Sequence, residues 1–269
     1  MTPETPHSSG TEREFPWWLA AAAAIGALIL WNIATDEVYA RILATLSRGI
    51  GMTAFVTVTA FVLAAALGLL LAVCVLSGSV ILRQTARFYI EIIRGVPMLV
   101  LLFYIAFVAA PALVAGWNAI AEPLGLAPMQ TRDLSLMWRA ILALTIGYSA
   151  FIAEVFRAGI QSVDAGQIEA AKALGLSGWQ RFRLIVFPQA IRTILPPLGN
   201  DFIALIKDSA LVSVLGVADI TQLGKIYAAG SFRFFETYNV VAFLYLVMTV
   251  GLSLALRGFE QRMRHRNSR

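Results

Sequence analysis

Long apolar runs separated by short polar segments dominate the pattern of this chain. A helix needs about 20 apolar residues to cross ~30 Å of hydrocarbon, and about six runs approach that length. Between them, the longest polar segment covers residues 157–192. Segment 219–236 reads as a loop, and 112–133 as a loop that could contain a short interfacial helix. The pattern predicts an all-α integral membrane protein with about six transmembrane helices. The predicted spans are 15–34, a stretch within 49–82, 88–110, 134–156, 193–215 and 237–256.

The composition supports lipid as the main solvent of the chain. Of its 269 residues, 59% are hydrophobic and 14% are charged, whereas a soluble domain carries about 25% charged residues. The net charge of +5 comes from short segments between apolar runs, without a basic stripe that would indicate nucleic-acid binding. The single cysteine, Cys74, lies within an apolar run and reads as buried filler.

The distribution of Lys and Arg predicts how the chain is oriented. With six spans, both termini lie on one side of the membrane, and the segments on that side carry fourteen Lys and Arg against seven on the other. This bias places the termini and segment 157–192 in the cytoplasm of a bacterial inner-membrane, multi-pass protein. Segment 1–14 lacks the positive start of a secretory signal, so it reads as a disordered cytoplasmic leader.

The polar segment 157–192 contains the signals of a short helix. Ser162 or Asp164 could cap a helix over residues 167–174, and Gly175 supplies a C-terminal stop. Three alanines give this helix a face with little bulk, where a partner could approach the backbone. Trp179 is a large apolar residue in a segment that should face water, so we expect another surface to pack on its side chain. On spacing alone, a short amphipathic helix lying on the membrane surface remains an open alternative.

The same segment also carries a longer pattern of fixed spacing. It resembles the EAA loop of ABC importer permeases, Glu-Ala-Ala-x3-Gly-x9-Ile-x-Leu-Pro, with Phe187 where Leu is usual. Residues 89–97, 153–161, 188–190, 197–200 and 207–209 are similar to the polar-amino-acid branch of that family, and the resemblance covers roughly 49–257. The residues that match the EAA pattern are Glu169, Ala170, Ala171, Gly175, Ile185 and Pro188.

The resemblance implies a type I ABC importer permease fold and the transport of amino acids. It implies that the loop contains a coupling helix, which docks on a separate ATPase and switches the permease between two states of access. The implied partners are ABC ATPase subunits, a second permease (the same chain or a homologous one), an extracytoplasmic solute-binding protein and an amino-acid substrate. ATP and Mg would be bound by the ATPase, with no cofactor in this chain. The implied coupling residues are Gly166, Glu169, Ala170, Ala171 and Gly175.

These inferences divide the chain into four expected parts. The leader is followed by an extra N-terminal transmembrane helix and an external loop. The permease core comes next and includes the cytoplasmic coupling loop 157–192, and a basic cytoplasmic tail ends the chain. Their expected bounds are 1–14, 15–48, 49–257 and 258–269.

Charged residues inside membrane spans are candidates for the substrate pathway, because each costs roughly 2.5–3.5 kcal/mol at mid-bilayer on insertion scales. Glu154 lies late in the fourth predicted span, where it either pairs with Arg157 three residues later or lines the pathway. Two interpretations are likewise open for Arg94: it contributes only to the excess of positive charge on the cytoplasmic side, or it lines the pathway.

The fifth predicted span is the most polar. Asn200 and Lys207 are seven residues apart on one helical face, and Asp201 and Asp208 repeat this spacing. Prolines at 196–197 predict a break in the helix just before them, and broken polar helices often line sites for zwitterionic solutes. The alternative is that Lys207 and Asp208 only mark the outer end of the span.

The sequence lacks the motifs expected for ATP binding, metal binding and histidine-based catalysis. The only Gly-Lys pair, Gly224-Lys225, is followed by Ile226 and does not fit a Walker A loop. Both histidines, His7 and His265, lie in the tails, so no metal or histidine catalysis is expected and the chain is not expected to be an enzyme. Residues 176–180 look like an ATPase signature by coincidence. An ion-gradient-driven secondary transporter or channel is the alternative function, and it would transport without an ATPase.

Overall fold

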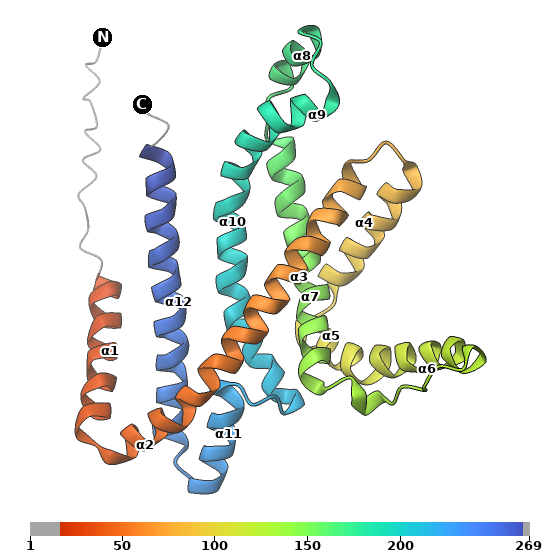
Figure 1. Ribbon diagram of the computed structural model, residues 1–269. Coiled ribbons are helices and arrows are strands. Elements are labelled where there is room, and N and C mark those ends of the chain that lie inside the picture. The colour runs from red at the N-terminus through yellow and green to blue at the C-terminus, as the bar shows by residue number, and fades with distance from the viewer. Residues whose placement is uncertain (1–16, 266–269) are drawn as a thin grey trace, which may run out of the picture.

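The computed structural model describes residues 17–265, and within that part the chain is helical with no strand. Long helices run side by side between two ends, with α8 and α9 at one end and α2 and α11 at the other (Figure 1). The predicted leader 1–14 and the last residues of the tail lie outside the described part. The α-helices are α1 (Trp17–Thr35), α2 (Glu37–Leu46), α3 (Ile50–Leu76), α4 (Val80–Gly95), α5 (Met98–Tyr104), α6 (Ala110–Ala121), α7 (Leu136–Gln161), α8 (Ala165–Ala173), α9 (Gly178–Arg181), α10 (Phe187–Asp208), α11 (Ile220–Ser231) and α12 (Phe234–His265).

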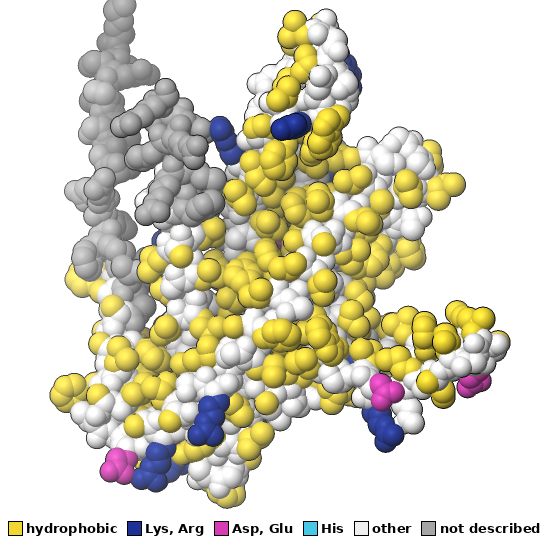
Figure 2. Space-filling model, viewed as in Figure 1, with side chains coloured by type: hydrophobic (Ala, Val, Ile, Leu, Met, Phe, Trp, Pro, Cys, Tyr) yellow, Lys and Arg dark blue, Asp and Glu magenta, His cyan; other side chains and the backbone are white. Residues whose placement is uncertain are grey.

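The surface is that of a membrane protein. In the view of Figure 2, apolar side chains cover the middle of the molecule, and the visible Lys and Arg side chains lie near its two ends. Among the described residues, four helical stretches are long and apolar enough to cross a membrane, and α1 and α10 are helices at the predicted first and fifth spans. The all-α membrane fold is therefore confirmed. The four stretches are Glu37–Leu76, Met98–Leu124, Leu136–Gln161 and Phe234–Gly258.

The core is built where α3 packs along α7. Ala60 and Ala64 of α3 are fully buried, and a Cβ added to Gly68 would lie 2.9 Å from Ile152 Cγ2 and 3.0 Å from the Ser149 carbonyl oxygen. Small residues spaced by four thus let the two helices approach to backbone contact. This close pair is the scaffold on which α4, α5 and α10 are placed.

The predicted third span, 88–110, is wrong as a single helix. Helix α4 ends at Gly95, Val96 is extended (φ −97, ψ 130), and Pro97 precedes α5. A residue before proline is pushed out of the helical region, which explains the break. The apolar helix then continues through the π-helical segment η2 (Ile105–Ala109) into α6, so the predicted loop 112–133 begins as helix.

The predicted break at residues 196–197 is also wrong. Helix α10 is continuous through both prolines, and the helix changes only after Asp208, where the 3-10 segment η6 (Ser209–Leu215) begins. Packing against α7 and α12 holds α10 on both sides of the prolines, with Ala190 and Ile194 buried before them and Leu205 and Ile206 buried after them. Tertiary contacts therefore override the local signal.

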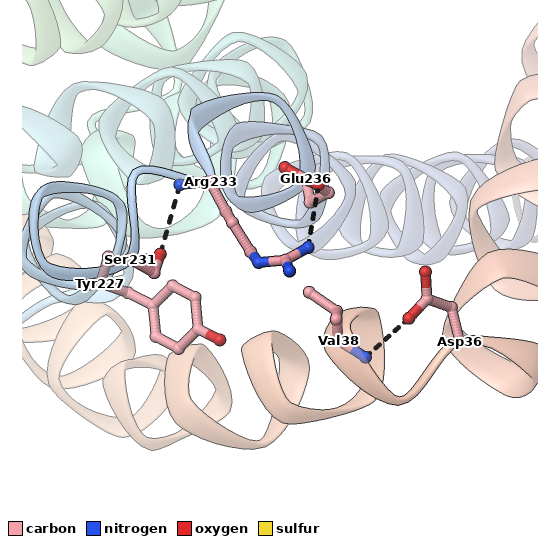
Figure 3. Close-up of polar contacts among 6 residues, drawn as sticks. All are labelled: Asp36, Val38, Tyr227, Ser231, Arg233 and Glu236. Atoms are coloured by element: carbon pink, nitrogen blue, oxygen red, sulfur yellow. Dashed lines mark hydrogen bonds and ion pairs between the residues drawn. The ribbon is translucent and has the colours of Figure 1, made fainter.

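The two expected outer loops near α2 and α11 are largely helical. Asp36 caps α2, its Oδ1 accepting a hydrogen bond of 2.7 Å from the Val38 N–H (Figure 3). Helix α11 occupies most of 219–236 and ends at Ser231, and the next residue, Phe232, takes a left-handed φ of 58. Ser231 Oγ accepts from the Arg233 N–H at 3.3 Å, which fixes the turn into α12 (Figure 3).

Candidate functional site

The polar segment between α7 and α10 presents α8 at one end of the molecule (Figure 1). Asp164 caps this helix, because its Oδ1 accepts a hydrogen bond from the Gln167 N–H at 3.2 Å. Ser162, the other predicted cap, instead donates to the Gly159 carbonyl at 2.8 Å. Gly175 has a φ of +75, the left-handed conformation that a glycine stop requires.

The predicted coupling residues do not all face outward. Gly166, Glu169, Ala170 and Gly175 are exposed, but Ala171 is only 1% exposed. The Ala171 side chain lies inside the loop and cannot contact a partner while the loop keeps this shape. The exposed face of α8 is therefore smaller than the motif suggests.

A hydrogen bond joins α8 to the start of α10. Gln189 Nε2 donates to Gln167 Oε1 at 2.6 Å and to the Ile185 carbonyl at 3.1 Å. Gln189 was not predicted to have a role of its own. One side chain of α10 therefore contacts α8 directly.

The rest of the loop contains the signature-like residues 176–180, whose Ser and Gln have a local structural role. It also exposes aromatic rings to solvent. Ser177 Oγ accepts from the Gln180 N–H at 3.3 Å, and Gln180 Oε1 accepts from the Ser177 N–H at 2.8 Å. This reciprocal capping box starts α9 and accounts for the Ser and Gln of the signature-like residues 176–180. Trp179 is 68% exposed, and its ring centroid lies 5.9 Å from that of Phe182.

The first cavity lies against α7 and α10 and has a volume of about 230 Å³. Tyr148 OH donates to Asp208 Oδ2 at 2.8 Å, and the cavity brings Asp208 together with Asp201 of the same helix. Asp201 Oδ2 is buried without a hydrogen-bond partner among the described residues. The lining residues are Ile93, Val96, Met98, Leu101, Tyr148, Phe151, Asp201, Ala204 and Asp208.

The second cavity is larger, about 410 Å³, and its lining is mostly charged. It brings together the predicted residues Arg94 of α4 and Glu154 of α7. Glu154 Oε2 pairs with Arg157 Nη2 at 2.6 Å, as the ion-pair interpretation predicts, and Glu154 also lines this cavity; that it lines the substrate pathway stays a prediction. The lining residues are Val75, Arg87, Glu91, Arg94, Glu154, Arg157 and Gln161.

One contact lies between the two cavities. The Arg94 guanidinium carbon is 5.7 Å from the centroid of the Phe151 ring, and Phe151 lines the first cavity while Arg94 lines the second. A cation over an aromatic face is worth about 0.5–1 kcal/mol at exposed sites. The charged cavity and the more apolar one therefore meet at a contact weak enough to break.

Asn200 and Lys207 lie apart from both cavities. Their side chains share one face of α10 and are exposed, whereas Asp201 and Asp208 on the neighbouring face are partly buried. Sequence reasoning missed Tyr148 and the residues of α4 other than Arg94. The signal that could have found Glu91 is the spacing Glu-x-x-Arg, which occurs on both α4 and α7.

A multi-pass helical protein that holds a capped helix outside its apolar body has the features of the membrane subunit of a transport system. A family model described as "Binding-protein-dependent transport system inner membrane component" matches residues 64–265. The chain belongs to this family, and it is a multi-pass inner-membrane protein. Helix α1 lies outside the matched region.

Named relatives agree with this assignment. The chain is 36% identical over 219 residues to the probable amino-acid permease protein YxeN of Bacillus subtilis (strain 168), covering 81% of this chain and 91% of that one. It is also 36% identical over 221 residues to the glutamine transport system permease protein GlnP of Escherichia coli (strain K12), covering 81% and 93%.

Solved structures give the same fold. A chain from the crystal structure of an amino acid ABC transporter with histidines matches with a TM-score of 0.68 and 37% identity, over 81% of this chain and 94% of that one. A chain of the MetNI methionine ABC transporter in an inward-facing conformation matches with a TM-score of 0.59 over 85% and 98%. At 22% identity, this second likeness supports the fold alone. The type I ABC importer permease fold is therefore confirmed.

Proposed function

We propose that this chain is the membrane-spanning permease subunit of an ATP-driven importer of amino acids. The observation that carries the proposal is α8, a capped helix held outside the body, in the loop that resembles the EAA loop of importer permeases. Relatives named as amino-acid and glutamine permeases, matched over 81% of the chain, support the class of substrate.

Helix α8 would transmit the movement of the ATPase. Gly166, Glu169, Ala170 and Gly175 form its exposed docking face, and the Gln189–Gln167 hydrogen bond ties it to α10. ATP and Mg would be bound by the ATPase subunits, because the chain has no Walker A motif. Closure of the ATPase pair would then bias the permease toward one of two arrangements.

The two cavities would form part of the pathway of the amino acid. Arg94 and Glu154 offer both signs of charge to a zwitterion, and Asp208 lies in the more apolar cavity.

The exposed face of α10 with Asn200 and Lys207 would face a second permease, the same chain or a homologous one. The solute-binding protein would deliver the amino acid at the end with α2 and α11. The termini and α8 would lie in the cytoplasm, as the distribution of Lys and Arg predicts.

Reconstitution in liposomes with the ATPase and the binding protein tests the proposal. We expect amino-acid uptake that requires ATP in the complete complex and none with the permease alone. Uptake by the permease alone, driven by an ion gradient, would instead establish the secondary-transporter alternative.

The docking face is tested by adding bulk to it. Ala170→Trp combined with Glu169→Lys should abolish co-purification with the ATPase, because both changes lie on the exposed face of α8. Ala229→Trp adds the same bulk to an exposed position of α11 at the opposite end and should leave co-purification unchanged. Normal co-purification of the α8 variant would contradict the docking role.

A further inference from the structure

The same charge motif occurs on two neighbouring helices. Glu91 and Arg94 of α4 have the spacing Glu-x-x-Arg, and so do Glu154 and Arg157 of α7. Residues three apart share one face of a helix. All four side chains line the same cavity of about 410 Å³, so the two motifs lie across it from one another.

The two motifs differ in their pairing. On α7, Arg157 bonds to Glu154 through both Nη2 at 2.6 Å and Nε at 3.0 Å, and its Nη1 donates to Gln161 at 2.5 Å. On α4, neither Glu91 nor Arg94 belongs to an ion pair within the described part of the chain, and Arg94 lies over Phe151 instead. Helix α4 thus presents unpaired charges of both signs to a complementary motif on α7.

Helix α4 has the features of an arm that can pivot. It packs against α3 and α7, burying Ala86 and Ile90, while Phe88 and Ile92 are exposed on its outer side. It lies at the edge of the molecule (Figure 1). The backbone is already extended at Val96, after the last residue of the helix, and the one backbone hydrogen bond that the Val96 N–H donates, to the Ile93 carbonyl, is long at 3.4 Å.

We infer that α4 and α7 form a charge-exchange latch at this cavity, in which Glu91 and Arg94 are gating residues. When α4 closes on α7, Glu91 meets Arg157 and Arg94 leaves Phe151 for Glu154, and the cavity no longer admits an amino acid. In the open arrangement, which is this structure, Arg94 lies over Phe151 of α7, about one turn before Glu154, and the α7 motif pairs with itself. This inference rests on the proposed transport function and adds the device that closes one mouth of the pathway.

Reversal of whole motifs tests the latch. The variant Glu154→Arg with Arg157→Glu keeps the pair within α7 but presents the wrong signs to α4, and Glu91→Arg with Arg94→Glu does the same from the other side. In liposomes with the ATPase and binding protein, we expect either reversal to lower uptake per ATP hydrolysed about tenfold, within the range of coupled charge pairs. Combining both reversals restores complementarity and should recover most of the lost uptake. A combined variant no better than the single reversals would overturn the latch.

Disulfide cross-linking gives a second test of the movement of α4 relative to α7, and this test does not depend on measuring uptake. In a Cys74→Ala background, Glu91→Cys with Arg157→Cys should form a disulfide in one nucleotide state of the complex and not in the other, since the bond needs Cα atoms about 4.4–6.8 Å apart. Equal cross-linking in both states would refute the movement. Arg83→Glu, a reversal on α4 outside the cavity lining, serves as the control and should leave uptake unchanged. Failure of the unmodified complex to take up amino acids would refute the proposed function itself, so the two failures are distinct.

Discussion

The close approach of α3 and α7 predicts that Gly68→Ala destabilises the protein. The added methyl group would lie 2.9 Å from Ile152 Cγ2, 3.0 Å from the Ser149 carbonyl oxygen and 3.1 Å from the Ala153 nitrogen. Two of these neighbours are backbone atoms that cannot rotate away, so the helices must separate. Overpacking of this kind costs about 1–3 kcal/mol.

Two other glycines supply matched controls, because substitution to alanine should change the stability of the protein differently at each of them. At Gly251, in the interior of α12, a Cβ would meet nothing within 4 Å, so Gly251→Ala should stabilise by about 0.5–1 kcal/mol through backbone entropy. At Gly147 the nearest atoms are Met98 Cε and Sδ, at 2.5 and 2.8 Å. A methionine side chain is flexible, so Gly147→Ala should cost less than Gly68→Ala.

Thermal unfolding in detergent, followed by the fluorescence of the tryptophans, measures the three variants side by side. One kcal/mol corresponds to a shift in Tm of about 2–4 °C for a domain of this size. We expect the Tm to fall for Gly68→Ala, to rise for Gly251→Ala and to lie between them for Gly147→Ala. If Gly68→Ala raised the Tm as much as Gly251→Ala, the reasoning from backbone contact between α3 and α7 would be refuted.

Four further substitutions test individual contacts. Asp164→Ala removes the cap of α8 at a cost of about 1 kcal/mol and should weaken co-purification with the ATPase several-fold. Gln189→Leu removes the bond to Gln167, and we expect ATP hydrolysis to continue while uptake per ATP falls; equal losses of both would argue against a link between α8 and α10. Tyr148→Phe deprives Asp208 of its donor and should raise the KM for uptake without changing complex assembly. Phe232→Gly relieves a left-handed backbone that costs about 1–2 kcal/mol, and because this side chain is 82% exposed, the Tm should rise.

The membrane class and the α8 loop were predictable because their signals are local or compositional. Apolar runs locate the long helices, and Asp164 and Gly175 mark the ends of α8 through the conformations that those residue types favour. The prolines show the limit of local signals. Pro97 stands at a real break, whereas the prolines at 196–197 lie within a continuous helix. The difference is set by what packs on each side of the proline, which the sequence does not state.

The cavities depend on contacts between helices far apart in the sequence. Arg94 and Glu154 were each found as costly charges in apolar surroundings, but nothing local indicates that they share a cavity. Tyr148 was missed because a tyrosine in an apolar span has no pattern of its own, and its role is defined by Asp208 on another helix. Asn200 and Lys207 share a helical face as predicted, yet that face turns away from both cavities.

The burial of Ala171 has a consequence for how such transporters diversify. Within one short motif, Glu169 and Ala170 face outward while Ala171 holds the loop together from inside. If α8 docks on the ATPase as proposed, a lineage that exchanges one ATPase for another can change the outward residues to suit the new partner and leave the loop intact. A change at Ala171 disturbs the packing of the loop whichever ATPase is present, so the fold of the permease constrains that position.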